Sequence, residues 1–364
     1  MSFGILHLVP DLQCSGMLRQ LTWICQDLAS IGCRVGVASL AGDGMMGDRL
    51  RQAGAQLLPI QPQVGRPAGW LRDLDAALAD FRPEIVHTWT GPANRWGRLA
   101  ARRRRVPQLI ASYRTVERNP LAWDRALERW LSAGTRAAVA NSESAEQYAL
   151  RAGVPAEKLR VIPNAVAANP PCSDEARRRL REELGLPEAT RLIGALGPLV
   201  PAKRIKDLLW AIDLLHAVRE DTYLLVVGDG PQRWRLERFS RQVHAAERTR
   251  FLGWRVDAPE LLAGLDCLWL GSARESLPNS VLEAMAAGVP VVAADSPATR
   301  QLIDPDRSGV LVAPGHRGGI ARATQQILES AEDAARLAAA ARQHVLRHHG
   351  LPDMLARYRE LYQL

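Results

Sequence analysis

Short apolar segments alternate with amphipathic helical segments along almost the whole chain. The first forty residues contain an apolar strand (Ile5–Val9), an amphipathic helix (Met17–Ile31) that ends at Gly32, and a second strand (Arg34–Leu40). A strand, a helix and a second strand in this order form a βαβ unit, in which the two strands are parallel. A chain built from such units is of the α/β class, with a parallel sheet between layers of helices.

A Pro-rich segment divides the alternation into two series. This segment, residues 163–187, contains PNAVAANPP and then a charged helix, and we place the interdomain linker near residues 166–172. We therefore expect two doubly wound α/β domains, at residues 1–168 and 169–343. Because Pro352 interrupts the final Ala/Arg-rich helices, the last helix, about residues 344–364, is expected to pack back on the first domain.

The composition suits two globular domains without a membrane span. With 364 residues, 47% of them hydrophobic, the chain is too long for one small core. It has no run of about 20 apolar residues, and its start, MSFGILHLVP, lacks the features of a signal peptide. The five cysteines form no C-x-x-C pair, which is typical of reduced core thiols. We expect a cytoplasmic protein.

The chain carries an excess of positive charge, with 47 Lys and Arg against 39 Asp and Glu. Such an excess favours anionic ligands, an anionic membrane surface or nucleic acid, and charge alone does not choose among them. The four arginines at 102–105 lie near the end of a predicted helix, where a solvated end is the simpler interpretation and a lipid patch the alternative. No aromatic–basic motif accompanies the charge, so we expect no nucleic-acid partner.

The strongest local signal is a pair of carboxylates, Glu275 and Glu283, within ESLPNSVLEAMAAGVP. The pattern predicts a strand end, a polar loop and a helix start. Ligands of open α/β sheets bind beyond the carboxyl ends of the strands, where a helix N-terminus attracts phosphate. Both carboxylates could then accept hydrogen bonds from sugar and ribose hydroxyls. The alternative is that Ser280 and Glu283 form a capping box while Glu275 is merely exposed, and the residues alone leave both interpretations open.

A second signal is the cluster of Lys203, Arg204 and Lys206 at a predicted helix start. This end of the helix dipole is unfavourable for positive charge. A docked diphosphate would supply the missing negative charge, and the alternative is that Asp207 and solvent screen the cations.

Two loops with glycine follow predicted strands. Gly228 opens the tight turn GDGP, and Gly16 opens the first helix, where a backbone is able to approach a ligand. There is no G-x-G-x-x-G motif, so a nicotinamide-dependent dehydrogenase gains no support. Histidines 344, 348 and 349 have helical spacing without an Asp or Cys ligand set, and no metal site is predicted.

In the order of these segments the chain resembles the retaining glycosyltransferase family 4, whose members have the GT-B fold. The resemblance runs from ILHLVP at residues 5–10 through Pro163-Asn, VGDGP at 227–231 and FLG at 251–253. Its most specific part is Glu275 to Glu283 with GVPVV following, which is similar to the family's Glu-x7-Glu donor motif. The resemblance implies two Rossmann-like domains that face a central cleft.

The resemblance also implies roles for individual residues. Lys203, helped by Arg204, would neutralise the donor diphosphate, Glu275 would meet the sugar, and Glu283 would hold the ribose hydroxyls. The leaving phosphate would help to deprotonate the acceptor, so no cofactor or metal is expected. Further expected donor-binding residues are Gly16, Gly197, Gly228, Trp254, Ser276, Leu277, Pro278 and Asn279, and the expected acceptor-side residues are His87 and Arg114.

Two positions depart from the family pattern. Pro198 stands where the family commonly has Arg, and Arg114 lies near the place of a common histidine. The implied partners are a nucleotide-sugar donor and an unknown sugar, lipid or small-molecule acceptor at the inner face of the plasma membrane, in glycolipid, polysaccharide or cell-envelope glycan synthesis. The alternatives are a nucleotide-sugar-binding protein that has lost turnover, and an epimerase or phosphorylase on the same fold.

Overall fold

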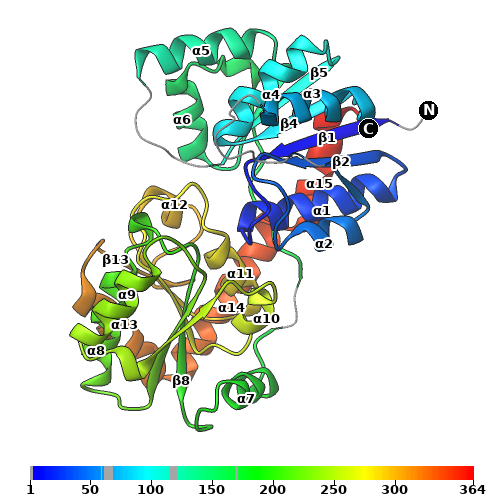
Figure 1. Cartoon of the computed structure of the whole chain (residues 1–364). Coiled ribbons are helices and arrows are strands. Elements are labelled where there is room, and N and C mark those ends of the chain that lie inside the picture. Colours follow the sequence, from blue (N-terminus) through cyan, green and yellow to red (C-terminus); the bar gives the residue numbers. More distant parts are fainter. Residues whose placement is uncertain (1–2, 59, 61–68, 115–120, 169–170) are drawn as a thin grey trace. The chain divides into compact units, whose positions relative to one another are not determined.

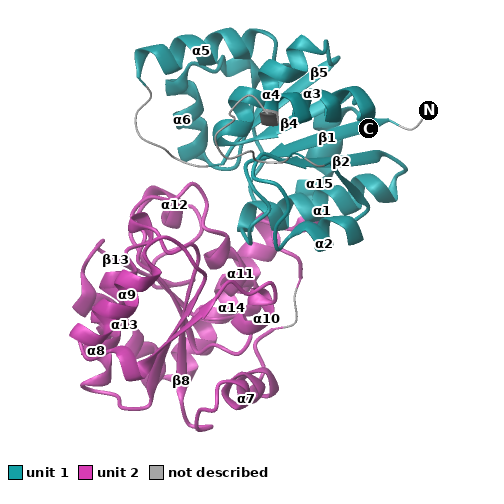
Figure 2. Cartoon of the chain, in the orientation of Figure 1, with its two compact units in different colours: residues 1–164, 352–364 teal, residues 165–351 magenta. Residues whose placement is uncertain are grey.

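The computed structural model describes residues 3–58, 60, 69–114, 121–168 and 171–364 (Figure 1). The chain divides into two compact units (Figure 2). Unit 1 consists of residues 1–164 and 352–364, and unit 2 of residues 165–351. The boundaries expected from the sequence lay after residues 168 and 343.

Unit 1 is built around a seven-stranded sheet whose paired strands are all parallel. The strand order is β3-β2-β1-β4-β5-β6-β7, so the direction of winding changes beside β1. Every residue of β1 is buried, as expected for a central strand covered on both faces. The strands are β1 (Gly4–Val9), β2 (Arg34–Ser39), β3 (Ala55–Leu58), β4 (Ile85–Trp89), β5 (Gln108–Tyr113), β6 (Ala137–Ala140) and β7 (Leu159–Val161).

Seven α-helices of the described residues accompany this sheet. Three of the elements in unit 1 are absent from the sequence prediction: α2 and β7 because they are short, and α6 because its buried face consists of alanines. The helices are α1 (Gly16–Ser30), α2 (Gly47–Gln52), α3 (Gly69–Phe81), α4 (Gly91–Arg103), α5 (Ala122–Ala133), α6 (Glu143–Ala152) and α15 (Leu351–Tyr362).

Unit 2 contains a six-stranded parallel sheet of order β10-β9-β8-β11-β12-β13, again wound in two directions from a central strand. The strands are β8 (Arg191–Leu196), β9 (Thr222–Val227), β10 (Thr249–Gly253), β11 (Cys267–Leu270), β12 (Val291–Ala294) and β13 (Val310–Val312). The helices are α7 (Asp174–Glu183), α8 (Ile205–His216), α9 (Arg233–Gln242), α10 (Ala258–Leu262), α11 (Asn279–Ala287), α12 (Pro297–Arg300), α13 (Arg317–Glu329) and α14 (Ala331–His348). Both sheets confirm the predicted α/β class with two Rossmann-like domains.

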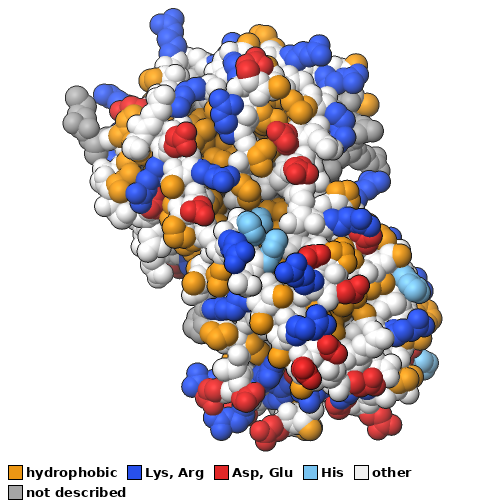
Figure 3. All heavy atoms as spheres, turned by 180° about the vertical axis from the view of Figure 1, so that it is seen from behind, with side chains coloured by type: hydrophobic (Ala, Val, Ile, Leu, Met, Phe, Trp, Pro, Cys, Tyr) orange, Lys and Arg blue, Asp and Glu red, His pale blue; other side chains and the backbone are white. Residues whose placement is uncertain are grey.

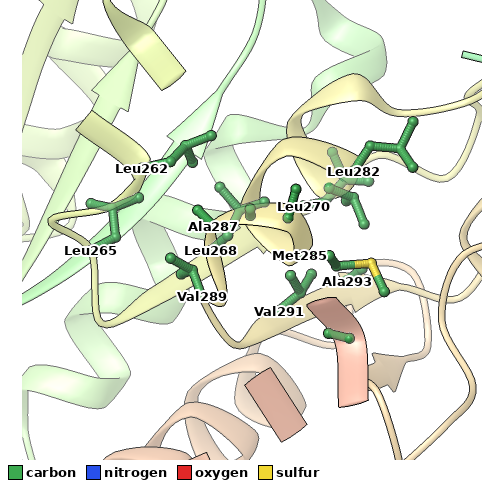
Figure 4. Close-up of a cluster of buried hydrophobic side chains, with 14 of the residues drawn as sticks. Leu262, Leu265, Leu268, Leu270, Leu282, Met285, Ala287, Val289, Val291 and Ala293 are labelled. Atoms are coloured by element: carbon green, nitrogen blue, oxygen red, sulfur yellow. The ribbon is translucent and has the colours of Figure 1, made fainter. Parts of the chain in front are cut away.

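The core of unit 2 has two faces because successive strand residues point to opposite sides of the sheet. Leu268 and Leu270 of β11 pack with residues of α10, α11 and β12 on one face (Figure 4). Cys267 and Trp269 of the same strand pack with α8 and α13 on the other. This alternation fixes the register of β11, which in turn fixes where the loop to α11 begins.

The end of the chain leaves unit 2 between two helices. Helix α14 ends at His348, Gly350 pairs with Val166 in an isolated bridge, and α15 then begins at Leu351. Pro352 is tolerated in this first turn because the N–H that it lacks has no partner within a helix. Among the described helices, none is both long and apolar enough to cross a membrane.

Candidate functional site

The candidate donor residues of unit 2 gather at the carboxyl ends of neighbouring strands β8 and β11. Lys203 comes from the loop after β8, and Glu275 from the loop between β11 and α11. The Lys203 Nζ atom lies 2.5 Å from Glu275 Oε1, and their side chains are only 17% and 14% exposed. The fold therefore brings together two residues that are 72 positions apart in sequence, at the edge where open α/β sheets bind ligands.

Glu283 lies on α11 and is 6% exposed. The helix begins at Asn279 with Pro278 as its N-cap, and no side chain caps it. Ser280 is therefore inside the first turn, and the capping-box interpretation of Ser280 and Glu283 is wrong. The backbone of Pro278 has an extended conformation (φ −74°, ψ 105°), and the helix starts two residues before the position that a capping box of Ser280 and Glu283 requires.

The last residues of the loop before α11 are buried, although Arg274 earlier in the loop is exposed. Ser276 and Leu277 are each 6% exposed, Pro278 is buried and Asn279 is half-buried. A buried loop is held in one shape, which suits a binding surface made of backbone amides.

The three cations at the start of α8 point to different partners. The Arg204 Nε atom donates to Asp207 Oδ2 at 2.8 Å, and Arg317 donates to the other carboxylate oxygen at 2.9 Å. Lys206 Nζ lies 5.0 Å from the centre of the Phe239 ring. The alternative interpretation, in which Asp207 balances the positive charge, is therefore correct for Arg204. Lys203 pairs with Glu275 instead. A role of Arg204 toward a diphosphate stays a prediction.

Gly197 and Gly228 allow the loops after β8 and β9 to touch. Both have positive φ, of 143° and 138°, and a Cβ on Gly228 would lie 2.0 Å from the Gly197 carbonyl oxygen. A Cβ on Gly197 would lie 3.2 Å from Lys203 Cε. These glycines therefore serve close backbone packing and leave room for the Lys203 side chain. Trp254 follows β10 directly and is half-buried.

In unit 1, Gly16 is the first residue of α1. Ser15 is the N-cap, and its hydroxyl oxygen accepts from the Leu18 amide at 3.3 Å. The first turn of α1 has no acidic residue. The placement agrees with the predicted helix start, and contact between Gly16 and a donor stays a prediction.

His87 and Arg114, the expected acceptor-side residues, lie in the interior of unit 1. The His87 ring is fully buried, with Nδ1 2.7 Å from the Tyr362 hydroxyl and Nε2 2.7 Å from the Ser112 hydroxyl. Arg114 donates to the Tyr358 hydroxyl at 3.2 Å and to the Asn164 side-chain oxygen.

Burial keeps the two histidines of this cluster neutral. It lowers the pKa of His87 well below its usual value, and the neighbouring His7 and Arg114 lower it further. Burial also lowers the pKa of His7 to about 3. The guanidinium of Arg114 lies over the Trp89 ring at 4.9 Å, and burial lowers its pKa too.

The tyrosines of α15 complete this cluster and were absent from the sequence prediction. Tyr358 and Tyr362 are spaced four residues apart and are both almost fully buried. This spacing on a terminal helix was the available signal that α15 has an inward aromatic face. The cluster gives His87 and Arg114 a packing role that the sequence did not reveal.

Among the described residues, no group of three or more His, Cys, Asp and Glu side chains has the arrangement of a metal site. His344 and His348 have ring centres 4.9 Å apart on α14.

Comparison with known proteins identifies the family. A model described as Glycosyltransferase Family 4 matches residues 15–169, and one described as Glycosyl transferases group 1 matches residues 176–344. The chain belongs to glycosyltransferase family 4. The second match contains Lys203, Glu275 and Glu283, so these three residues of this family 4 chain lie within the part that the family model covers.

Named relatives share parts of the sequence. The chain is 32% identical over 148 residues to the lipopolysaccharide core biosynthesis glycosyltransferase LpsE of Rhizobium meliloti (strain 1021), covering 41% of this chain and 42% of that protein. It is 27% identical to the 2-deoxystreptamine N-acetyl-D-glucosaminyltransferase of Streptomyces fradiae, covering 94% of this chain and 87% of that protein. The chain spans about half the length of several of its curated relatives.

Solved structures share the fold of this family 4 chain. Anabaena Alr3699/HepE in complex with UDP-glucose has a TM-score of 0.86 at 23% identity, covering 99% of this chain and 100% of that chain. WaaG, a glycosyltransferase involved in lipopolysaccharide biosynthesis, has a TM-score of 0.73 at 15% identity, covering 99% of each chain. Both comparisons support the GT-B architecture.

Proposed function

We propose that this chain is a retaining glycosyltransferase that moves a sugar from a nucleotide-diphosphate sugar to an acceptor hydroxyl. The observation that carries the proposal is the Lys203–Glu275 pair at the carboxyl edge of the unit 2 sheet. Family membership and a relative named for lipopolysaccharide core synthesis support this function. The acceptor would belong to glycolipid, polysaccharide or cell-envelope glycan synthesis.

Each donor residue has a chemical task in this proposal. The Lys203 ammonium would neutralise the diphosphate, and the first amides of α11 would bind phosphate oxygens. Glu283 would accept hydrogen bonds from the ribose hydroxyls. Glu275 would meet the sugar while holding Lys203 in place through their 2.5 Å contact. Removal of one such electrostatic contact typically lowers a rate about 10²–10³-fold.

The transfer itself would proceed on one face of the sugar. The bond between the anomeric carbon and the diphosphate oxygen breaks, and the acceptor oxygen forms its bond on the face that the diphosphate leaves. The acceptor proton passes to the departing phosphate oxygen, so that the anomeric configuration is retained. Because Lys203 would balance the phosphate charge, the proposal includes neither a metal nor another cofactor.

Two further partners complete the proposal. A sugar, lipid or small molecule would be the acceptor, and an anionic membrane surface would hold the protein at the inner face of the plasma membrane. The exposed arginines at the end of α4 support the second partner, since Arg103 and Arg105 lie on the surface.

Calorimetric titration with UDP, GDP and ADP in the presence of EDTA tests the donor site. We expect one nucleotide to bind the wild type selectively, with Lys203→Ala and Glu283→Ala each weakening it about tenfold or more, because a charged hydrogen bond is lost. Lys206→Ala is the matched control, since this cation lies over Phe239, and it should keep wild-type affinity.

The same titration has clear contrary outcomes. No binding of any of the three nucleotides would refute the donor-site assignment. Binding that appears only after Mg²⁺ replaces EDTA would refute the metal-free part of the proposal. Equal weakening by Lys206→Ala would show a general effect of charge rather than a site built on Lys203.

A further inference from the structure

Helix α5 of unit 1 presents an aromatic and basic face to solvent. Trp123 is 57% exposed and Trp130 is 52% exposed, and they are seven residues apart, which places them on the same side of the helix. Arg125 and Arg129 are also exposed. Ala122, Ala126 and Ala133 complete the exposed residues of α5, so this face contains no carboxylate.

The acidic residues of α5 are turned toward the protein. Asp124 forms an ion pair with Arg95 at 3.0 Å, and Glu128 forms one with the buried Arg98 at 2.7 Å. Within the part of the chain that the structure describes, Arg125 and Arg129 have no carboxylate partner. The charges of α5 are therefore sorted, with the negative side chains inside and the positive ones outside.

Helix α4 extends this face. Its Arg95 guanidinium lies 5.2 Å from the Trp123 ring centre, and its Arg102 guanidinium lies 4.3 Å from that of Trp130. These contacts hold both indoles at the surface with cations beside them. Leu121, the residue before α5, is 61% exposed.

Elsewhere the surface charge is mixed. On the face in Figure 3, the Lys and Arg side chains are interspersed with Asp and Glu. Helix α7, for example, pairs Arg178 and Arg179 with Glu175 of its own first turn. Among the described residues, other exposed arginines, such as Arg238 and Arg241 on α9, also have no carboxylate partner, so α5 is set apart by carrying two exposed tryptophans together with its arginines.

We propose that α5 and the adjoining end of α4 dock on an anionic phospholipid bilayer. Indole rings are favoured at the level of the lipid headgroups, and arginines are attracted by headgroup phosphates. The alanines between them have small side chains, so the helix is able to lie close to the membrane plane and insert shallowly. This inference rests on the membrane association proposed above, and it is independent of the donor chemistry in unit 2.

Co-sedimentation with vesicles tests the docking surface. Vesicles of equal parts phosphatidylcholine and phosphatidylglycerol are compared with pure phosphatidylcholine vesicles. We expect the wild type to prefer the anionic vesicles and to be released by high salt. The double variant Trp123→Ala/Trp130→Ala should bind about tenfold or more weakly, and Arg125→Gln/Arg129→Gln should lose about fivefold per arginine.

A second exposed tryptophan provides the matched control. Trp234 on α9 is 58% exposed and lies 5.1 Å from the Arg235 guanidinium. Trp234→Ala should bind anionic vesicles like the wild type, because α9 has a single exposed tryptophan and lacks the pair on one side of the helix that α5 has. Circular dichroism and the nucleotide titration should be unchanged in the α5 variants, which shows that loss of vesicle binding does not reflect unfolding.

Several outcomes would overturn the docking proposal. These are equal binding to both kinds of vesicle, wild-type binding by the Trp123/Trp130 variant, or the same loss in Trp234→Ala. Single-stranded RNA or a second copy of the chain could instead occupy α5. If the wild type does not bind vesicles but binds RNA, or forms dimers in light scattering, and the α5 substitutions abolish that binding or those dimers, one of these partners occupies α5 instead. Failure to bind nucleotide would count against the transferase proposal and leave the docking surface intact.

Discussion

At the scale of single residues, Gly228 shows how closely the loops at the carboxyl edge of the unit 2 sheet are packed. Its amide donates to the Gly253 carbonyl at 2.8 Å. A Cβ added to Gly228 would overlap the Gly197 carbonyl oxygen. The three loops after β8, β9 and β10 therefore pack through their backbones. A side chain here must move a loop that ends near Lys203.

We expect Gly228→Ala to lower the free energy of unfolding by more than about 2 kcal/mol, through steric overlap and the cost of positive φ. Chemical denaturation measures this. Gly318→Ala is the control, because nothing lies within 4 Å of its added Cβ and it lies in helix α13. That variant should be neutral or slightly more stable. Equal losses in both variants would contradict the packing explanation.

At the scale of elements, α15 is fastened to unit 1 by polar contacts in a buried aromatic cluster. Tyr362 reaches His87, Tyr358 reaches Arg114, and Arg136 donates to the Leu361 carbonyl at 2.9 Å. Arg359 also pairs with Asp27 of α1. Buried polar groups are costly when left unpaired, so these contacts fix both the position and the rotation of the helix.

Tyr362→Phe tests this fastening. We expect it to lower the free energy of unfolding by about 1–3 kcal/mol, because the buried Nδ1 of His87 loses its partner. Tyr223→Phe is the matched control, since its hydroxyl accepts from Arg248 in a site that is only partly buried, and it should stay within about 0.5 kcal/mol of the wild type. A loss for Tyr362→Phe no larger than that of the control would contradict a role for the hydroxyl.

At the scale of the whole molecule, unit 2 is one continuous stretch of chain, whereas unit 1 needs residues from both ends. Unit 2 also has a core on both faces of its own sheet. A continuous segment with its own core is able to fold alone. Residues 1–164 without α15 would leave the His87 cluster open to water.

We expect a fragment of residues 165–351 to fold cooperatively and to bind the nucleotide selected by the full chain within about tenfold of its affinity. Thermal unfolding with and without that nucleotide measures both properties. A fragment of residues 1–164 is the comparison, and we expect it to unfold at a lower temperature than unit 1 of the full chain. Absence of a cooperative transition in the 165–351 fragment would contradict the independence of unit 2.

Much of the fold follows from local pattern. The alternation of apolar segments with amphipathic helices predicted two parallel α/β domains, and the Glu275–Glu283 spacing predicted a strand, a loop and a helix. Both predictions depend on side-chain period and on backbone preferences, which act between near neighbours in sequence. The short β7 and the six-residue α2 escaped this reasoning because they contain too few residues to show a period, and α6 escaped it because its buried face consists of alanines, which are only weakly apolar.

Local sequence patterns predicted the fold class, the family resemblance and the strand, loop and helix that carry Glu275 and Glu283. Only the tertiary structure decided which side chains meet. It paired Lys203 with Glu275, turned Arg204 to Asp207, started α11 at Asn279 and enclosed His87 beneath Tyr362. These outcomes depend on contacts between residues far apart in the chain, which are set by the packing of whole elements and leave no periodic signal in a local segment.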